Sequence, residues 1–346
     1  MHMADALLSP GVAGAMYVAS AAAAAVSVHT LRRSEEDEQK LPVMAVSAAL
    51  VFAGQMINYT IPGTGSSGHL CGGMLLSALL GPQAGFLSMI VILAIQCLFF
   101  ADGGLLALGA NIWNMAFYGC FVGYYLIWRP IMRRKSMAPR TRIILASMLG
   151  CVLTLQLGAL SVVIETTLSG ITELPFAAFA ALMQPIHLAI GAVEGLITAA
   201  VLLFLYEARP ELLRDVDDAE KGAKLSLKAT VIVLSAVALL VGGGLSLAAS
   251  SHPDGLEWAL FGNGEAGYSD NMALDEEDFG VSSGAADTAA AIQETTSFLP
   301  DYGFSDSDSA AGTSVSGVVG SAMVAGVAVL IALAGGFFRR RRAARG

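Results

Sequence analysis

The sequence predicts an all-α, polytopic membrane protein. Hydrophobic residues occupy 55% of the 346 positions and charged residues only 14%, and the mean hydropathy is +0.66. Soluble domains carry about 25% charged residues, so these values exclude an ordinary soluble domain. Apolar stretches recur along the chain, and most of them reach the ~20 residues with which an α-helix crosses a bilayer.

About nine transmembrane helices are expected. The third apolar stretch is too short to cross a bilayer alone, so it is either a half-helix buried against its neighbours or no span at all. The nine stretches cover residues 11–31, 41–58, 70–80, 84–101, 108–128, 141–168, 176–206, 228–250 and 317–338.

Positively charged residues orient the predicted spans. With nine spans, all the Arg and Lys clusters lie on one side, which the positive-inside rule makes cytoplasmic. The N-terminus is then outside and the C-terminus inside, and His2, the loop around His69, the Asp102 loop and the segment 251–316 share the outer face. The clusters follow the first, fifth, seventh and ninth stretches, at 32–40, 129–142, 209–224 and 339–342.

A charged stretch at 208–227 divides the chain. Pro210 and the mixed charges around it interrupt any continuous helix, which predicts a cytoplasmic linker between a membrane domain at 1–207 and a second unit at 228–346. In the second unit two helices enclose residues 251–316, which hold 13 Asp or Glu and no Lys or Arg. Most of this acidic segment is expected to be solvated and partly disordered, and its charge concentrates cations near the outer face.

The first two residues form a candidate metal chelate. The terminal amine of Met1, the amide nitrogen of His2 and the ring of His2 close fused five- and six-membered rings around one ion. His69, in a glycine-rich loop on the same predicted face, would supply a fourth nitrogen. Four nitrogens in a plane suit Ni(II) and Cu(II) and are possible for Co(II). From position alone, an ordinary exposed terminal residue is the alternative interpretation of His2.

The opening residues argue against a cleaved signal peptide. Residues 1–10 contain no Lys or Arg and include Asp5, whereas a secretory signal begins with positive charge. A histidine at position 2 also disfavours removal of Met1. We therefore expect the free amine to be that of Met1.

Two ionisable residues lie within one predicted helix. His187 and Glu194 are seven positions apart and so share a face. Such residues commonly make interhelical hydrogen bonds, and a metal-bound histidine also needs an outer hydrogen-bond partner. Support of the site or of the packing is therefore expected, and direct ligation by His187 stays open.

Three polar residues near other span ends, Asp102, Asn111 and Asn114, are expected to orient the N-terminal segment rather than to touch metal. The four cysteines form no Cys-x-x-Cys pair and fit the packing of small apolar side chains. Cys71 lies two residues from His69, so an additional soft ligand at this position stays open.

Several motifs occur together in the first 207 residues: Met1-His2 followed by Leu8-Ser9-Pro10, Thr64-Gly65-Ser66-Ser67-Gly68-His69-Leu70, Leu80-Gly81-Pro82, Ala101-Asp102-Gly103-Gly104 and Leu108-Gly109-Ala110-Asn111. In combination they resemble the cobalt and nickel substrate-binding components (CbiM/NikM type) of energy-coupling-factor transporters. The resemblance implies a seven-helix capture unit. The metal ligands that it implies in this chain are Met1, His2 and His69.

A second motif opens the acidic segment. His252-Pro253-Asp254-Gly255-Leu256-Glu257-Trp258 resembles the PDGLE segment of the small two-helix accessory subunit of the same transporters. The resemblance implies that this subunit is fused to the capture unit, and that its loop contacts the capture unit during metal loading.

The sequence contains no Gly-x-x-x-x-Gly-Lys-Ser/Thr loop and no nucleophile–base pair, so neither ATP hydrolysis nor another enzyme activity is expected. The resemblance implies a transmembrane coupling subunit and cytoplasmic ATPase subunits as partners, in a prokaryotic cell membrane. It implies Ni(II) or Co(II) as cargo, without choosing between them, and no cofactor. No nucleic-acid partner is expected.

Two other functions fit the same residues. An ion-coupled secondary carrier that works without an ATPase is favoured by charges within spans, such as Glu165 and Glu194. A metal-responsive membrane sensor would use the acidic segment as its detector. Uptake without an ATPase would identify the carrier, and binding without uptake would identify the sensor.

Overall fold

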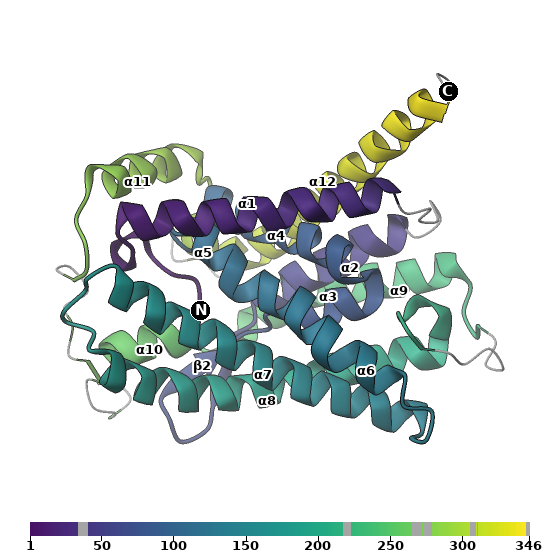
Figure 1. The fold of residues 1–346 in the computed structure, drawn as a ribbon, viewed down its shortest axis with the longest axis horizontal. Coiled ribbons are helices and arrows are strands. Elements are labelled where there is room, and N and C mark those ends of the chain that lie inside the picture. Colours follow the sequence, from purple (N-terminus) through teal and green to yellow (C-terminus); the bar gives the residue numbers. More distant parts are fainter. Residues whose placement is uncertain are drawn as a thin grey trace.

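The computed structural model describes residues 1–33, 41–216, 223–264, 279–304 and 311–343, with single positions 267, 271, 272, 274 and 309 between them. The protein is mainly helical, and its long helices run roughly along one axis (Figure 1). The N-terminus lies in the half of the molecule that holds α10 and α11, and α6 lies at the opposite end (Figure 1).

The helices and strands follow one another along the chain in this order. The first half contains η1 (Asp5–Leu7), α1 (Pro10–Arg33), α2 (Leu41–Gln55), β1 (Tyr59–Ile61), β2 (Ser66–Gly68), α3 (Gly73–Leu80), α4 (Pro82–Phe100), α5 (Leu108–Asn111), the π-helix η3 (Ile112–Trp128) and α6 (Arg129–Met132). The second half contains α7 (Pro139–Leu168), α8 (Phe176–Ala208), η4 (Pro210–Leu212), α9 (Leu227–Gly243), η5 (Leu245–Ala248), α10 (Gly255–Phe261), α11 (Gly284–Thr296), η6 (Pro300–Tyr302) and α12 (Ala311–Ala343).

Every apolar stretch of the sequence coincides with a helix. Within the described residues, five helices are long and apolar enough to cross a membrane: α1, α4, α7, α8 and α12. The helices α2 and α9 are apolar but shorter. The prediction of a mainly helical protein with several helices long and apolar enough to cross a membrane is therefore confirmed, whereas the count of nine spans and their orientation remain predictions.

The short third stretch is a buried half-helix, α3. All eight of its residues are buried. It begins after Gly72, whose φ of +83° is unfavourable for residues with a Cβ, and a Cβ there would lie 2.4 Å from Cγ1 of Val51. The glycine lets the chain turn into α3 close to the adjacent α2.

The two long helices α7 and α8 pack against each other through glycines of α8. A Cβ at Gly191 would lie 2.9 Å from Cα of Val152, and one at Gly195 would lie 2.9 Å from Cα of Met148. Small residues allow the backbones to approach closely in the way that is common between membrane helices. The resulting α7–α8 pair carries His187 and Glu194 on its inner side.

One small sheet departs from the predicted all-α class. β1 and β2 pair as an antiparallel hairpin, with Tyr59 opposite Gly68 and Ile61 opposite Ser66. The glycine-rich sequence at 63–68 permits the turn, in which Gly63 and Gly65 have φ values of +77° and +74°. The hairpin ends directly before His69 and so fixes the position of that residue.

The second unit packs along the first. α9 and α12 contact each other and both contact α2. A Cβ at Gly242 would lie 3.0 Å from the carbonyl oxygen of Gly317, so the crossing of α9 and α12 is close.

The described part of the acidic segment contains regular structure, although most residues of α11 are exposed. Helices α10 and α11 and the turn η6 form there. Asp254 and Ser283 cap the two helices with side-chain oxygens, and Leu256 and Leu299 are buried. Capping and apolar burial thus order parts of a segment whose net charge suggested solvation.

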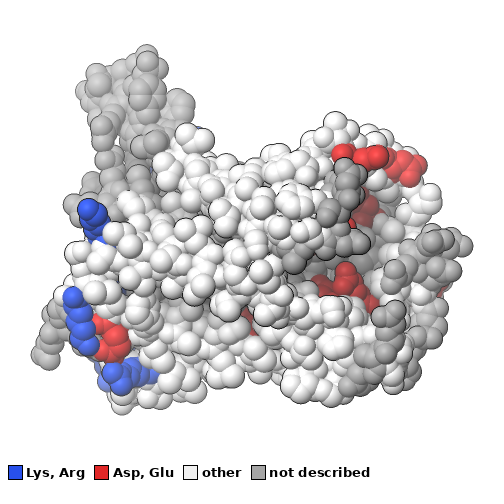
Figure 2. Space-filling view, turned by 180° about the vertical axis from the view of Figure 1, so that it is seen from behind, with Lys and Arg blue, Asp and Glu red and all other residues white. Residues whose placement is uncertain are grey.

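Charged side chains separate along the long axis. Figure 2 shows Lys and Arg at one end and Asp and Glu mainly at the other, where some line a hollow. By the positive-inside rule, the end that carries Lys and Arg is the one expected on the cytoplasmic side.

The charged linker predicted at 208–227 lies partly outside the described residues, at 217–222. Its first part packs under α3: Arg214 donates its backbone N–H to the carbonyl of Ala78 at 2.8 Å and a guanidinium N–H to that of Leu80 at 2.9 Å.

Candidate metal centre

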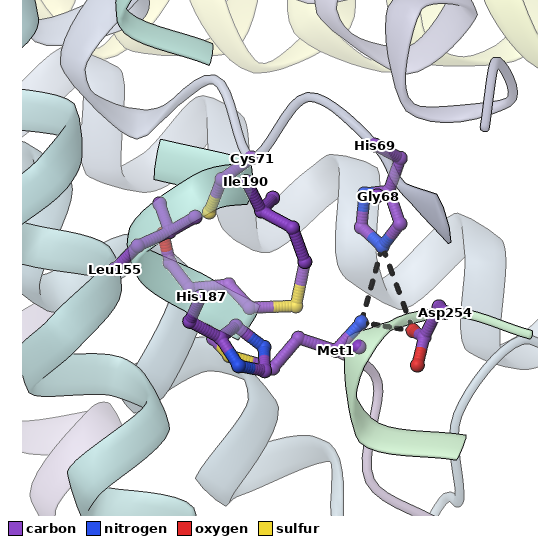
Figure 3. A pocket seen from close by; sticks show the side chains of 10 residues that line it. Met1, Gly68, His69, Cys71, Leu155, His187, Ile190 and Asp254 are labelled. Atoms are coloured by element: carbon purple, nitrogen blue, oxygen red, sulfur yellow. Dashed lines mark hydrogen bonds and ion pairs between the residues drawn. The ribbon is translucent and has the colours of Figure 1, made fainter. Parts of the chain in front are cut away.

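A cavity at the α10 end of the molecule brings several of the predicted residues together (Figure 3). The volume open to the centre of a water-sized sphere is about 20 Å³, which is enough for one water molecule or an ion of similar size. Its lining comes from the N-terminus, the β2 loop, η3, α7, α8 and the PDGLE motif. The lining residues are Met1, Gly68, His69, Cys71, Met115, Leu155, His187, Ile190, Asp254 and Gly255.

The terminal amine of Met1 lies between two side chains from distant parts of the chain. Its nitrogen is 3.1 Å from Nε2 of His69. It also donates a short, charged hydrogen bond to Oδ2 of Asp254, the second residue of the PDGLE sequence (Figure 3). Oδ2 of Asp254 in turn lies 3.9 Å from Nε2 of His69. One amine, one imidazole and one carboxylate therefore converge on a single point.

The tautomer of His69 suits metal binding. Its Nδ1 lies 3.1 Å from the carbonyl oxygen of Leu70, and since a carbonyl only accepts, Nδ1 carries the proton. The lone pair is then on Nε2, which faces the amine of Met1. A backbone carbonyl that fixes the ring in this way is the usual support of a metal-binding histidine.

His2 lies beside this group, but its ring is held elsewhere. The rings of His2 and His69 are stacked, with centroids 5.4 Å apart. Nδ1 of His2 is 3.0 Å from Oδ1 of Asp102, so this nitrogen donates to the carboxylate. The six-membered chelate needs Nδ1 as a ligand, and the ring must therefore leave Asp102 before the four-nitrogen set can form. Nε2 of His2 is buried and has no hydrogen-bond partner among the described residues.

Asn111 holds the N-terminal segment in place through hydrogen bonds to the backbone of Met3. It accepts the N–H of Met3 at 2.8 Å and donates to the carbonyl of Met3 at 3.2 Å. Gly104 donates its N–H to the same carbonyl at 2.9 Å, and Asp5 accepts the N–H of Ala107 at 3.0 Å. These contacts leave little freedom to the amine two residues earlier.

Asn114 and Glu194 lie deeper and touch neither the amine nor His69. Asn114 donates to the buried carboxylate of Glu165 at 2.8 Å. Glu194 accepts the N–H of Gly72 at 2.9 Å through Oε1, and so ties α8 to the start of α3. Both carboxylates have protein partners that hold helices together.

His187 and Cys71 line the cavity wall away from the amine (Figure 3). Nδ1 of His187 lies 2.8 Å from the carbonyl of Met183, so Nδ1 is the protonated nitrogen. Its Nε2 is buried, without a hydrogen-bond partner in the described part of the chain, and faces Gly255. The thiol of Cys71 donates to the carbonyl of Met115 at 3.1 Å.

The PDGLE motif docks on the loop that carries His69. Ser67 donates its N–H to the carbonyl of Pro253 and its hydroxyl to that of His252, each at 2.8 Å. Gly255 has no room for a side chain, because a Cβ there would lie 2.8 Å from Cδ1 of Ile190. Leu256 is buried, and Glu257 accepts the N–H of Asp254 at 3.0 Å to complete a capping box at the start of α10.

A second contact between the two units involves residues that no sequence motif predicted. Gln293 in α11 donates to the carbonyls of Gly103 and Cys97 at 2.8 and 3.0 Å and accepts the N–H of Leu105 at 3.2 Å. Tyr302 donates to the carboxylate of Asp102. The apolar residues around position 300, which interrupt the acidic run, were the available indication that this segment packs.

Burial and nearby charges set the protonation of the site. Burial, together with the charges of the terminal amine and His2, lowers the pKa of His69 to about 3. Burial also lowers the pKa of His2 below its usual 6.5, although Asp102 opposes this shift. Burial favours neutral Asp254, but the amine and His69 outweigh it and hold the pKa of Asp254 well below its usual range. At neutral pH the site therefore combines neutral imidazoles with a carboxylate.

Comparison with known proteins identifies both units. The family model described as "Cobalt uptake substrate-specific transmembrane region" (CbiM) matches residues 2–212, and the PDGLE domain matches residues 228–335. The putative fused nickel transport protein NikMN of Archaeoglobus fulgidus is 35% identical over 94% of this chain and 95% of its own length. A putative metal transport protein of Haloquadratum walsbyi is 34% identical over 62% of this chain and 93% of its own length.

A solved structure shares the fold of the larger unit. The crystal structure of a transition metal transporter superimposes with a TM-score of 0.51 and 35% identity, over 60% of this chain and 93% of that one. A truncated form gives a TM-score of 0.52 and 34% identity. The chain therefore belongs to the CbiM family of cobalt uptake substrate-specific transmembrane proteins, and it carries a PDGLE domain behind the CbiM region.

Proposed function

We propose that this chain is the substrate-capture membrane component of an ATP-driven energy-coupling-factor importer for nickel or cobalt ions. The observation that carries the proposal is the 3.1 Å approach of the Met1 amine to the free lone pair of His69, inside a small buried cavity. The nickel and cobalt transport proteins among its relatives support the same cargo.

In the loaded state the ligands are the amine of Met1, the amide and ring nitrogens of His2 and Nε2 of His69. Before all four nitrogens can bind one ion, the amine and the amide of His2 must each lose a proton, and the ring of His2 must turn from Asp102 with its proton moved from Nδ1 to Nε2. Asp102, Asn111, Asn114, His187 and Glu194 hold the surrounding loops and helices.

The domain division follows the sequence: a capture domain at 1–207, a linker at 208–227 and a PDGLE-type accessory domain at 228–346. A separate transmembrane coupling subunit and cytoplasmic ATPases supply the energy, and the complex works in the prokaryotic cell membrane. The basic end of the molecule, opposite the cavity, is the side toward which the ion is released (Figure 2).

Calorimetric titration of Ni(II) and Co(II) into the purified full-length chain tests the capture site. The unmodified chain, with Met1 verified as its first residue by mass spectrometry, is compared with a form carrying two extra residues ahead of Met1 and with His2→Ala and His69→Ala. The extension and both substitutions should abolish tight binding. Unchanged tight binding in all three would contradict the nitrogen site, and metal uptake by the chain alone, without an ATPase partner, would favour a secondary carrier.

A further inference from the structure

Asp254 has one carboxylate oxygen for each of two tasks. Oδ1 accepts the N–H groups of Leu256 and Glu257 at 2.8 and 3.0 Å and so caps α10. Oδ2 points the other way, to the amine of Met1 and toward His69 (Figure 3). The side chain is only 14% exposed, and capping α10 leaves Oδ2 available to the cavity.

The three converging donors have the spacing of ligands around one ion. For bonds of about 2 Å, ligands on opposite sides of an ion lie about 4 Å apart, and neighbouring ligands lie about 3 Å apart. Oδ2 of Asp254 and Nε2 of His69 are 3.9 Å apart, and the amine of Met1 is 3.1 Å from Nε2 of His69 and within hydrogen-bonding distance of Oδ2. One ion midway between Asp254 and His69 would therefore contact all three donors.

His2 is not part of this set, because its Nδ1 is bonded to Asp102. In the planar four-nitrogen arrangement, the amine and ring nitrogens of the chelate lie beside the ligand from His69, and the amide nitrogen of His2 lies opposite it. Oδ2 of Asp254 thus occupies the position that the amide nitrogen must take later. A carboxylate and a deprotonated amide each bring one negative charge, so this exchange leaves the charge around the ion unchanged.

We propose that Asp254 is a transient oxygen ligand with which the PDGLE domain loads the site. The arriving Ni(II) or Co(II) first binds to the amine of Met1, which gives one proton to solvent, and to Nε2 of His69 and Oδ2 of Asp254. His2 then leaves Asp102, the proton of its Nδ1 passes by way of solvent to its Nε2, and its amide gives one proton to solvent. The amide and Nδ1 of His2 then displace the oxygen of Asp254. This inference rests on the proposed function, since it assigns an earlier step at the same site.

Stopped-flow mixing of Co(II) or Ni(II) with the purified full-length chain tests this order, with calorimetry for the equilibrium constant. The test variant is Asp254→Asn, because asparagine caps helices as well as aspartate does and keeps an oxygen for α10. The matched control is Asp287→Asn, which removes one negative charge from exposed α11 at the same end of the molecule. It accounts for the loss of long-range attraction between the protein and the cation.

The association rate constant of Asp254→Asn should fall at least about tenfold, the lower end of the effect of supporting residues at metal sites. The Kd of Asp254→Asn should change less than about threefold, because Asp254 is no longer a ligand in the loaded site. Asp287→Asn should change both the association rate constant and Kd less than about twofold. An association rate of Asp254→Asn equal to that of Asp287→Asn would overturn the inference.

A trapped early complex provides an independent measurement. His2→Ala cannot complete the chelate, so it should retain weak Co(II) binding, visible as d–d absorption, that His2→Ala/Asp254→Asn lacks. Weak binding that is equal in the single and double variants would also overturn the inference. If the unmodified chain binds neither metal, both the proposed function and this inference fail. If the unmodified chain binds metal and Asp254→Asn associates at the unmodified rate, only the loading step is contradicted.

Discussion

The amine of Met1 lies 3.1 Å from Nε2 of His69, although 68 positions separate the two residues. The hairpin β1–β2 and the bonds of Asn111 to Met3 bring them together from opposite sides. Two nitrogens at this distance are spaced as neighbouring ligands of a metal ion. The amine of Met1 is a metal ligand in the proposed site, and the predictions below test what holds it in place.

Metal affinity should fall steeply as the pH is lowered, and protonation of His69 should not be the cause. The pKa of His69 is lowered to about 3 and that of His2 lies below 6.5. A lowered pKa means that protons compete with metal for His69 only near pH 3. Binding must displace one proton from the Met1 amine and one from the His2 amide, so Kd should rise by up to about a hundredfold per pH unit lost.

Calorimetry in buffers of different ionisation enthalpy measures the protons released on binding between pH 6 and 8. About two protons per ion are expected, because the amine and the amide each release one. A Kd that is constant over this range, or no proton release, would contradict ligation by the amine and the amide.

Asn111→Ala should weaken metal binding about tenfold or more while leaving the protein folded. The substitution removes both hydrogen bonds that fix Met3, and buried hydrogen bonds contribute about 1 kcal/mol each. The amine then loses its fixed position. Gln83→Ala is the matched control. It removes one exposed hydrogen bond, from the side-chain amide of Gln83 to the hydroxyl of Tyr125, at the start of α4 and away from the N-terminal segment. Equal Kd values for the two variants, measured by titration, would argue against this role of Asn111.

Gly104→Ala should displace the N-terminal segment. A Cβ at this position would lie 1.8 Å from Oδ1 and 2.5 Å from the backbone nitrogen of Asp5, and overpacking of this kind typically costs about 1–3 kcal/mol. Loss of metal binding is expected with little change in helix content by circular dichroism. Gly11→Ala is the control, since no heavy atom lies within 4 Å of a Cβ there, and it should bind metal normally. Normal binding by Gly104→Ala would show that Asp5 does not fix the amine.

Tyr302→Phe should loosen the loop that holds His2. The substitution keeps the ring stacked on Phe100 and removes only the hydroxyl that donates to Asp102. A hydrogen bond to a charged group contributes about 1.5–3 kcal/mol, so backbone amides at 102–105 should exchange with deuterium about tenfold faster. Tyr124→Phe removes a similar bond, to Asp215, away from this loop and should leave exchange at 102–105 unchanged. Equal deuterium exchange rates at 102–105 in the two variants would contradict a stabilising hydrogen bond between Tyr302 and Asp102.

Composition and motif spacing predicted the helices and the residues at the centre of the site. Apolar stretches must form helices in a membrane because backbone polar groups have no other partners there, so each predicted range coincides with a helix. Counting spans put Met1 and His69 on one predicted face, which allowed a shared site, and the family resemblance implied that the two residues meet there. Neither argument depends on side-chain packing.

Contacts that depend on packing were beyond the sequence. The position of Nδ1 of His2 is set by a rotation of its ring toward Asp102, and no pattern encodes this rotation. Asp254 was recognised within a motif, but its approach to the amine depends on how α10 docks against Ile190. The packing of Gln293 and Tyr302 was missed because the net charge of the acidic segment concealed a few buried apolar residues.

Docking of α10 onto the loop of His69 has a consequence for assembly. The relative from Haloquadratum walsbyi matches only 62% of this chain but 93% of its own length, so that protein corresponds to only part of this chain. Here α10 and the loop of His69 belong to one chain, so the contact between them is an intramolecular event with a high effective concentration. A few hydrogen bonds then suffice to keep Asp254 at the amine, at a fixed ratio of one to one, however little of the protein a cell makes.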